Sequence, residues 1–202
     1  MTPTFLFDID GTLVDSSLLI SDVWRQVAEE FGADVQEILA VCHGRRDSEI
    51  VPMFFRDADV PAVLARIQEL EGAGTDLVRA MPNALALLER LPADRWAVVT
   101  SGPRALMAGR LRSSGLPVPA VFVAAEDVTK GKPDPEGYLA AASALGADPG
   151  RCVVVEDAPA GVAAGRRAGM RVIAVTTTHR ADEIQEADVI VGGLAEIDLV
   201  TE

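Results

Sequence analysis

Acidic residues stand at the ends of two apolar runs. Asp8 and Asp10 close the run TFLFDID, and Glu156 and Asp157 follow CVVV. Residues two apart on an extended chain point to the same side, so the carboxylates of Asp8 and Asp10 can face one pocket. Carboxylates at the end of a buried strand are costly unless a group of opposite charge meets them. The sequence therefore predicts a metal ion or a cationic side chain beside these acids.

A hydroxyl-rich turn and a lysine follow two further apolar runs. The stretch VVTSGP carries Thr100, Ser101 and Gly102 where a strand is expected to end and a helix to begin. Hydroxyl and backbone N–H groups at a helix N-terminus suit a phosphate, although the same residue types also form ordinary N-caps. Lys132, one of only two lysines, lies in the turn GKP just before a predicted helix. Such a lysine can be directed either at an anion or at water.

Together these residues describe phosphoryl transfer. Asp8, Asp10 and Asp157 offer hard oxygen ligands of the kind that magnesium prefers. Thr100 can donate to a phosphoryl group, and Lys132 can neutralise nearby carboxylates. One of the first two aspartates can attack phosphorus while the other serves as acid and base. A calcium loop also begins DxDG, but it needs a glycine at position six and a further acid at position twelve, whereas here Leu13 and Val14 follow.

Composition limits the range of partners. The chain has 202 residues and a net charge of −13, which disfavours nucleic acid or an anionic membrane, because both bind basic surfaces. No apolar run approaches the roughly 20 residues that cross a bilayer, and no basic leader precedes the first strand, so we expect a cytoplasmic protein. Cys42 and Cys152 show no metal-ligand spacing and are expected to be reduced thiols.

Alternation of strands and helices predicts a doubly wound α/β fold with a parallel sheet. The expected strands are 4–10, 96–99, 120–124, 152–155, 172–175 and 189–191. The expected helices are 83–91, 103–114, 135–145 and 158–168. Ligands of such sheets bind beyond the carboxyl ends of the strands, where the polar residues described above are expected to lie.

The segment that follows the first strand is predicted to be an all-helical insert. Apolar residues recur at helical spacing over 18–31, 35–41, 48–55 and 61–70, and no strand is expected there. We therefore predict a core formed by residues 1–14 and 80–202, with residues 15–79 inserted in it. Trp24, Trp96 and the apolar run 53–55 are expected in the hydrophobic core, and Trp24 can also face the pocket.

Four motifs resemble those of the haloacid dehalogenase superfamily, in order and across nearly the whole chain. They are FDIDGT at 7–12, the strand-end Thr100, Lys132 in GKPDPEGY, and EDAPAG at 156–161. The stretches HGRR, WAVVTSG and VEDAPAGVAAGRRAG are most similar to the branch of small sugar and polyol phosphatases. This branch includes hydrolases of 2-deoxyglucose 6-phosphate, glycerol 3-phosphate and hexitol phosphates.

The resemblance implies a role for each matched residue. Asp8 would be the nucleophile that forms an aspartyl phosphate, and Asp10 would protonate the leaving oxygen and then activate water. Thr100 would bind the phosphoryl oxygens with Ser101 and Gly102, and Lys132 would steady Asp8 and the phosphate. The implied Mg²⁺ ligands are the carboxylate of Asp8, the backbone carbonyl of Asp10, the carboxylate of Asp157, and Glu156 directly or through water.

The resemblance also implies that the helical insert is a small cap that closes over the site and excludes water. Substrate choice in this family depends on the cap. The stretch Cys42-His43-Gly44-Arg45-Arg46 begins a cap helix, and Arg46 is expected to reach the substrate, aided by Arg45 or His43. The expected partner is therefore a small phosphorylated sugar or polyol. A closed cap and an acidic surface favour a monomer.

Three other functions are weighed against a phosphatase. The β-phosphoglucomutases share the four motifs and the cap type, but TSG after the strand at 96–99 and the EDAPAG motif favour hydrolysis. Dehalogenation of a 2-haloacid uses an aspartate nucleophile without a metal, so Asp10 and Asp157 count against it. A phosphate-binding or chaperone-like protein without activity would not need all four motifs together.

Overall fold

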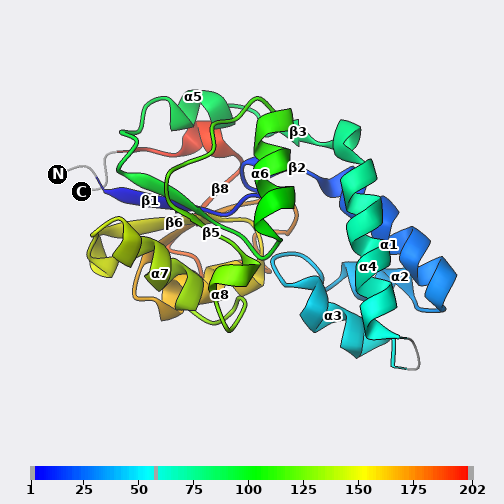
Figure 1. The fold of residues 1–202 in the computed structure, drawn as a ribbon. Helices are drawn as coiled ribbons and strands as arrows, with labels where there is room; N and C mark the ends of the chain where they lie inside the picture. The colour runs from blue at the N-terminus through cyan, green and yellow to red at the C-terminus, as the bar shows by residue number, and fades with distance from the viewer. Residues whose placement is uncertain (1–2, 57–58, 200–202) are drawn as a thin grey trace.

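The computed structural model describes residues 3–56 and 59–199, and its centre is a six-stranded parallel sheet (Figure 1). The strand order is β5-β4-β1-β6-β7-β8. The chain therefore starts in the middle of the sheet and winds outward in both directions, which confirms the predicted doubly wound fold. The strands are β1 (Thr4–Phe7), β4 (Trp96–Val99), β5 (Phe122–Val123), β6 (Cys152–Glu156), β7 (Arg171–Val175) and β8 (Val189–Val191).

Helices cover both faces of the sheet, so its central strands are apolar on both sides. In Figure 1, α5 (Ala84–Leu88) and α6 (Arg104–Ser113) lie above the sheet, and α7 (Glu136–Ala144) and α8 (Pro159–Arg167) lie below it. Successive residues of β1 join different clusters: Phe5 and Phe7 pack on the α6 side, and Leu6 packs with α7. A strand buried on both faces in this way reads as a continuous apolar run.

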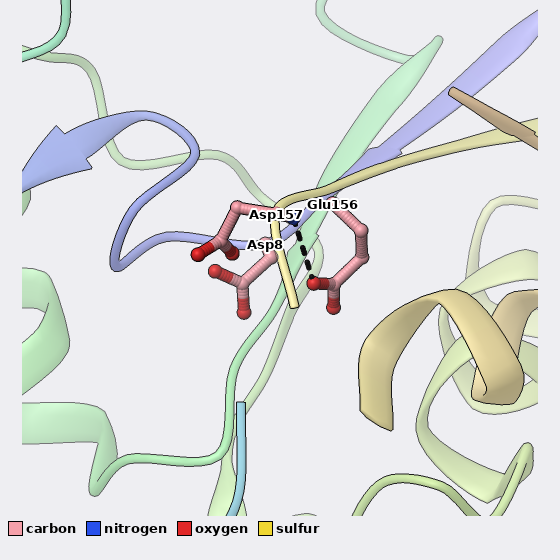
Figure 2. A group of neighbouring side chains, drawn as sticks. All are labelled: Asp8, Glu156 and Asp157. Carbon is pink, nitrogen blue, oxygen red and sulfur yellow. Dashed lines mark hydrogen bonds between the residues drawn. The ribbon is translucent and has the colours of Figure 1, made fainter. Parts of the chain in front are cut away.

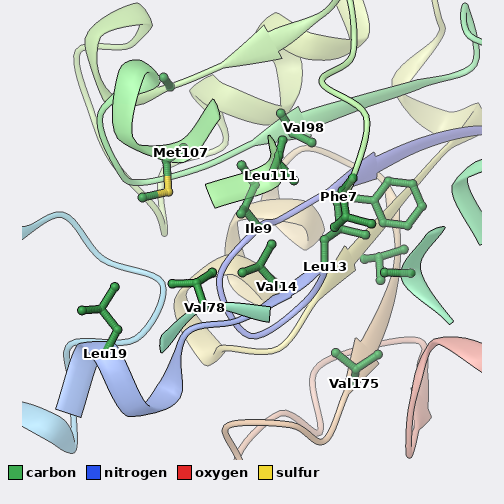
Figure 3. Packing of buried hydrophobic residues seen from close by; sticks show 14 of the residues in the cluster. Phe7, Ile9, Leu13, Val14, Leu19, Val78, Val98, Met107, Leu111 and Val175 are labelled. Carbon is green, nitrogen blue, oxygen red and sulfur yellow. The ribbon is translucent and has the colours of Figure 1, made fainter. Parts of the chain in front are cut away.

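The hydrophobic cluster on the α6 side continues into the base of the helical insert. Figure 3 shows Met107 and Leu111 of α6 in one cluster with Phe7 and Leu19. Leu19 belongs to the first helix of the insert, and its side chain is buried. The insert and the sheet therefore share apolar packing where they meet, and α6 is the core helix that lies beside the insert.

Among residues 15–56 and 59–79 the insert contains a short 3-10 helix, η1 (Thr75–Leu77), and four α-helices: α1 (Ser17–Phe31), α2 (Val35–Leu39), α3 (Asp47–Phe54) and α4 (Val60–Ala73). They correspond to the four predicted helices and lie to one side of the sheet in Figure 1. This arrangement agrees with a small helical cap, and its exact limits at residues 15 and 79 remain a prediction. No helix in residues 3–56 or 59–199 is long and apolar enough to span a membrane.

Two local features of the insert differ from the prediction. The expectation of no strand there is wrong, because β2 (Val14–Asp15) pairs antiparallel with β3 (Arg79–Ala80) at the two ends of the insert. Strands of two residues are too short to show alternation, and they form because the entering and leaving chains meet. The prediction of a fully buried run at 53–55 is also wrong, since Met53 is 46% exposed while Phe55 is buried.

The other sequence expectations for the core hold with small shifts in boundaries. Trp24 and Trp96 are buried. Cys42 and Cys152 are buried and form no disulfide. Strand β5 has only two residues, and α5 ends at Leu88, three residues before the predicted end.

Candidate active site

Acidic residues gather at the carboxyl ends of the two central strands. Register places Phe7 of β1 beside Val155 of β6, and the Asp8 N–H donates to the Val155 carbonyl at 3.0 Å. Asp8 therefore lies next to Glu156 and Asp157, as Figure 2 shows. All three are buried, with at most 4% of each residue exposed. Three acids in so little solvent require compensating charge.

Lys132 supplies part of that charge. Its Nζ lies 2.5 Å from Asp8 Oδ1 and 2.6 Å from Glu156 Oε1, and only 5% of the residue is exposed. Burial alone would lower the pKa of Lys132, but the two carboxylates outweigh burial and raise it, so the amine stays protonated. Burial raises the pKa of Asp8, against the attraction of Lys132. The site thus holds one fixed cation against three acids.

Glu156 is held in place by neutral donors as well as by Lys132. The Tyr138 hydroxyl donates to Glu156 Oε1 at 2.6 Å, and the Asp157 N–H donates to Oε2 at 3.1 Å, the bond dashed in Figure 2. Gly161 of α8 packs against the same carboxylate so closely that a Cβ there would overlap it. This packing explains the glycine in the EDAPAG motif.

Asp157 is oriented by hydroxyl groups. Thr12 Oγ1 donates to Asp157 Oδ1 at 3.2 Å, and Thr178 Oγ1 donates to Oδ2. Gly11, at φ +85°, passes so close that any Cβ would overlap the Asp157 carboxylate. Burial, followed by the charge of Glu156, raises the pKa of Asp157 to about 7. Thr178 was missed in the sequence because nothing in its spacing links it to a strand 21 residues earlier.

The three acids meet the chemical requirements of a divalent-cation site. Asp8, Glu156 and Asp157 each offer an oxygen within 4.8 Å of the others, and this is the one such group found among the described residues. In Figure 2 the Asp8 and Asp157 carboxylates lie side by side, while the Glu156 carboxylate is turned to the other side. Hard carboxylate oxygens suit magnesium, and a second cation would complete the charge balance that Lys132 begins.

The side chain of Asp10 is bound by Arg110. Arg110 of α6 donates through Nη1 to Asp10 Oδ2 at 2.6 Å and through Nη2 to Glu71 Oε1 at 2.7 Å. Neither Arg110 nor Glu71 was predicted. Each had a signal: Glu71 continues the buried series Val63 and Ile67 at intervals of four, and Arg110 lies on the buried face of α6.

The turn after β4 lies on the opposite side of the site. Thr100 is buried, and its Oγ1 accepts from the Gly102 N–H at 3.2 Å. Ser101 Oγ instead donates to the Gly44 carbonyl of the cap at 2.8 Å. Thr100, Ser101 and Gly102 all line one cavity with Asp8 and Asp10. The predicted phosphate-binding residues therefore share this cavity with Asp8 and Asp10.

That cavity has walls from both the core and the cap. Among the predicted cap residues, His43 and Arg45 line it, and Trp24 forms another part of its wall. Arg46 lies elsewhere: its Nη2 donates to the Val128 carbonyl at 3.0 Å, on the loop that precedes Lys132. A ligand in this cavity can therefore contact residues of both the core and the cap.

Comparison with known proteins agrees with this geometry. The family model for haloacid dehalogenase-like hydrolases matches residues 2–169. The chain belongs to this family. It is therefore a hydrolase with the fold of this family. A hydrolase from Pseudomonas syringae superposes with a TM-score of 0.87 at 25% identity, over 96% of this chain and 95% of that one.

Curated relatives indicate the branch of the family to which the chain is most similar. Hexitol phosphatase A of Escherichia coli (strain K12) is 41% identical, over 96% of this chain and 92% of that protein. 2-Deoxyglucose-6-phosphate phosphatase 1 of Saccharomyces cerevisiae is 32% identical, over 96% of this chain and 89% of that protein. The resemblance to the sugar and polyol phosphatase branch is thereby confirmed.

Proposed function

We propose that this protein is a magnesium-dependent phosphatase that hydrolyses a small sugar or polyol phosphate through an aspartyl phosphate. The observation that carries the proposal is the position of Asp8. Its carboxylate lies in contact with Lys132, beside Asp157, at the floor of a cavity that the cap also lines. Its relatives are phosphatases of sugar and polyol phosphates, which supports the substrate class.

In the first step Asp8 attacks phosphorus. A bond forms between an Asp8 carboxylate oxygen and phosphorus, the bond from phosphorus to the ester oxygen breaks, and Asp10 gives its proton to the departing alkoxide. Thr100 and the backbone N–H groups of the turn donate to the phosphoryl oxygens. Lys132 holds the Asp8 carboxylate in the attacking orientation through its contact with Oδ1.

In the second step water regenerates Asp8. Asp10, now a carboxylate, takes a proton from water as the water oxygen attacks phosphorus and the bond to Asp8 breaks. Inorganic phosphate leaves, and Asp10 is again protonated. The cap limits the entry of other water while the phosphoenzyme exists.

The proposed ligands of Mg²⁺ are the carboxylates of Asp8 and Asp157, the backbone carbonyl of Asp10, and Glu156 directly or through water. When bound, the ion offsets the negative charge that the phosphate adds beside Asp8 and Asp157. Thr12 and Thr178 hold the Asp157 carboxylate for this purpose. Lys132 binds Asp8 and Glu156, so an ion held by the same cluster would add to the positive charge that the amine supplies.

The cap side of the cavity supports a neutral, hydroxyl-rich leaving group. Asp47 and Glu71 line this side together with Arg45 and His43, and Arg110 is already bound to Asp10 and Glu71. The hydroxyl groups of a polyol can donate to the two carboxylates. A phosphomutase must rebind a sugar bisphosphate, and the phosphatase relatives give that alternative less support.

The test is release of inorganic phosphate from hexose, hexitol, glycerol and nucleotide monophosphates, each with Mg²⁺ and with EDTA. We expect release that depends on Mg²⁺ and is fastest with sugar or polyol phosphates. Conversion of glucose 1-phosphate to an isomer without phosphate release would instead establish a mutase.

A cytoplasmic, monomeric state without nucleic-acid or membrane partners stays a prediction, to be checked by fractionation and light scattering.

A further inference from the structure

A buried arginine joins the cap to the core beside Asp10. Arg110 belongs to α6 of the core, and only 1% of it is exposed. One of its terminal nitrogens binds Asp10 in the loop after β1, at 2.6 Å, and the other binds Glu71 of cap helix α4, at 2.7 Å. A single guanidinium therefore bridges two parts of the molecule that are separate in the chain.

The two oxygens of Asp10 have different surroundings. Oδ2 accepts from Arg110, while Oδ1 is buried and has no hydrogen-bond partner among the described residues. Asp10 also lines the cavity next to Asp8. Fixing Oδ2 leaves Oδ1 as the oxygen that can exchange a proton with a leaving group or water.

Glu71 occupies a position that packing alone would give to an apolar residue. It follows Val63 and Ile67 at intervals of four on the buried stripe of α4, and only 8% of it is exposed. A buried carboxylate there is tolerated because Arg110 binds it. Hydrogen bonds between charged groups are short and directional, so this contact fixes the guanidinium as well as balancing charge.

We propose that Arg110 is a positioning residue that orients Asp10, and that Glu71 makes this orientation depend on the cap lying over the site. The proposal rests on the proposed phosphatase function. When α4 lies over the core, Glu71 and Asp10 hold the guanidinium from two sides. Without Glu71 the guanidinium can rotate, and Asp10 loses the alignment that proton transfer to a substrate oxygen requires.

The test separates proton transfer from the rest of catalysis. Glu71→Gln keeps the shape of the side chain and removes its charge. Arg110→Lys keeps the positive charge but loses the two terminal nitrogens that bind Asp10 and Glu71 together. The rate of Asp8 phosphorylation is measured by rapid-quench kinetics with two substrates. One is a hexitol phosphate, whose leaving group needs a proton, and the other is p-nitrophenyl phosphate, whose leaving group does not. We expect each variant to be slowed about tenfold or more with the hexitol phosphate and about twofold or less with p-nitrophenyl phosphate.

Glu69→Gln is the matched control, because Glu69 lies on the same helix and pairs with Arg66, but its side chain is 69% exposed. This variant should match the wild type with both substrates. Calorimetry with inorganic phosphate should give similar affinities for the wild type and Glu71→Gln, since the phosphate side of the cavity is untouched.

Equal rates in wild type and both variants, equal losses with both substrates, or a change confined to KM would each overturn the positioning role. Absence of turnover by the wild type with every phosphate ester is a separate result. It would overturn the proposed function first, and this proposal with it.

Discussion

Replacing Lys132 by methionine should destabilise the metal-free protein strongly and in a pH-dependent way. The wild-type cluster sets one cation against Asp8, Glu156 and Asp157, and the side chains of Lys132, Asp8 and Glu156 are at most 6% exposed. The variant keeps the length of the side chain but leaves the carboxylates without their cation. Removal of one partner from a buried ion pair typically costs about 3–5 kcal/mol.

That cost converts to a measurable shift in melting temperature. For a chain of this size each kcal/mol lowers Tm by roughly 2–4 °C, so Lys132→Met should melt about 6–20 °C below wild type in EDTA at pH 8. The deficit should shrink toward pH 5, because the unpaired native carboxylates then take up protons more readily than those of the unfolded chain. Magnesium should also reduce it, by supplying a cation to the same acids.

Lys130→Met is the matched control in the same turn. The Lys130 side chain is 73% exposed and its Nζ lies 3.8 Å from Asp134, so the variant should melt within about 2 °C of wild type. Thermal scans at three pH values, with EDTA and with Mg²⁺, provide the measurement. A Lys132→Met protein that melts with the wild type in EDTA at pH 8 would refute the claim that Lys132 compensates this cluster.

Two further predictions concern packing and a cap acid. Gly161→Ala should lower both Tm and activity, since its Cβ would overlap the Glu156 carboxylate. The control Gly109→Ala, in α6, meets no neighbour, so urea unfolding should show its free energy of unfolding raised by about 0.5–1 kcal/mol. Equal stabilities of the two variants would contradict the overlap. Burial, with the charge of Glu71, raises the pKa of Asp47 from 3.8 to about 7. The native state then holds a proton that the unfolded state releases between about pH 4 and 7, so this residue costs stability as pH rises through that window. Asp47→Asn should therefore melt at a higher temperature than wild type at pH 8, with a free energy of unfolding that is greater by at most about 4 kcal/mol. The difference should vanish near pH 4, and a difference that does not depend on pH would contradict this prediction.

The part of the site that lies at strand ends could be predicted from the sequence. Asp8 and Thr100 follow apolar runs directly and Asp157 comes one residue later, and the rule that parallel strands present their carboxyl ends at one edge brings such residues together. The helical insert was likewise visible from its periodicity. These features depend on contacts between neighbours in sequence or on a general property of the sheet.

The missed features depend on how distant elements dock. Thr178 reaches Asp157 from the loop after β7, and Arg110 of α6 meets Glu71 only because the folded chain brings α4 of the cap within reach of it. Arg46 illustrates the same limit. Its place in the sequence suggests a substrate contact, but its guanidinium binds backbone carbonyls of the loop before Lys132. Side-chain direction at a cap-core contact is set by tertiary packing rather than by local pattern.

The most direct test of the central claim is to locate the phosphate in a reaction quenched with acid. The wild type with Mg²⁺ and a hexitol phosphate should yield a peptide containing Asp8 that carries one phosphate by mass spectrometry. Asp8→Asn should yield none and release no inorganic phosphate. Phosphate found on another residue, or undiminished turnover by Asp8→Asn, would contradict an aspartyl phosphate at Asp8.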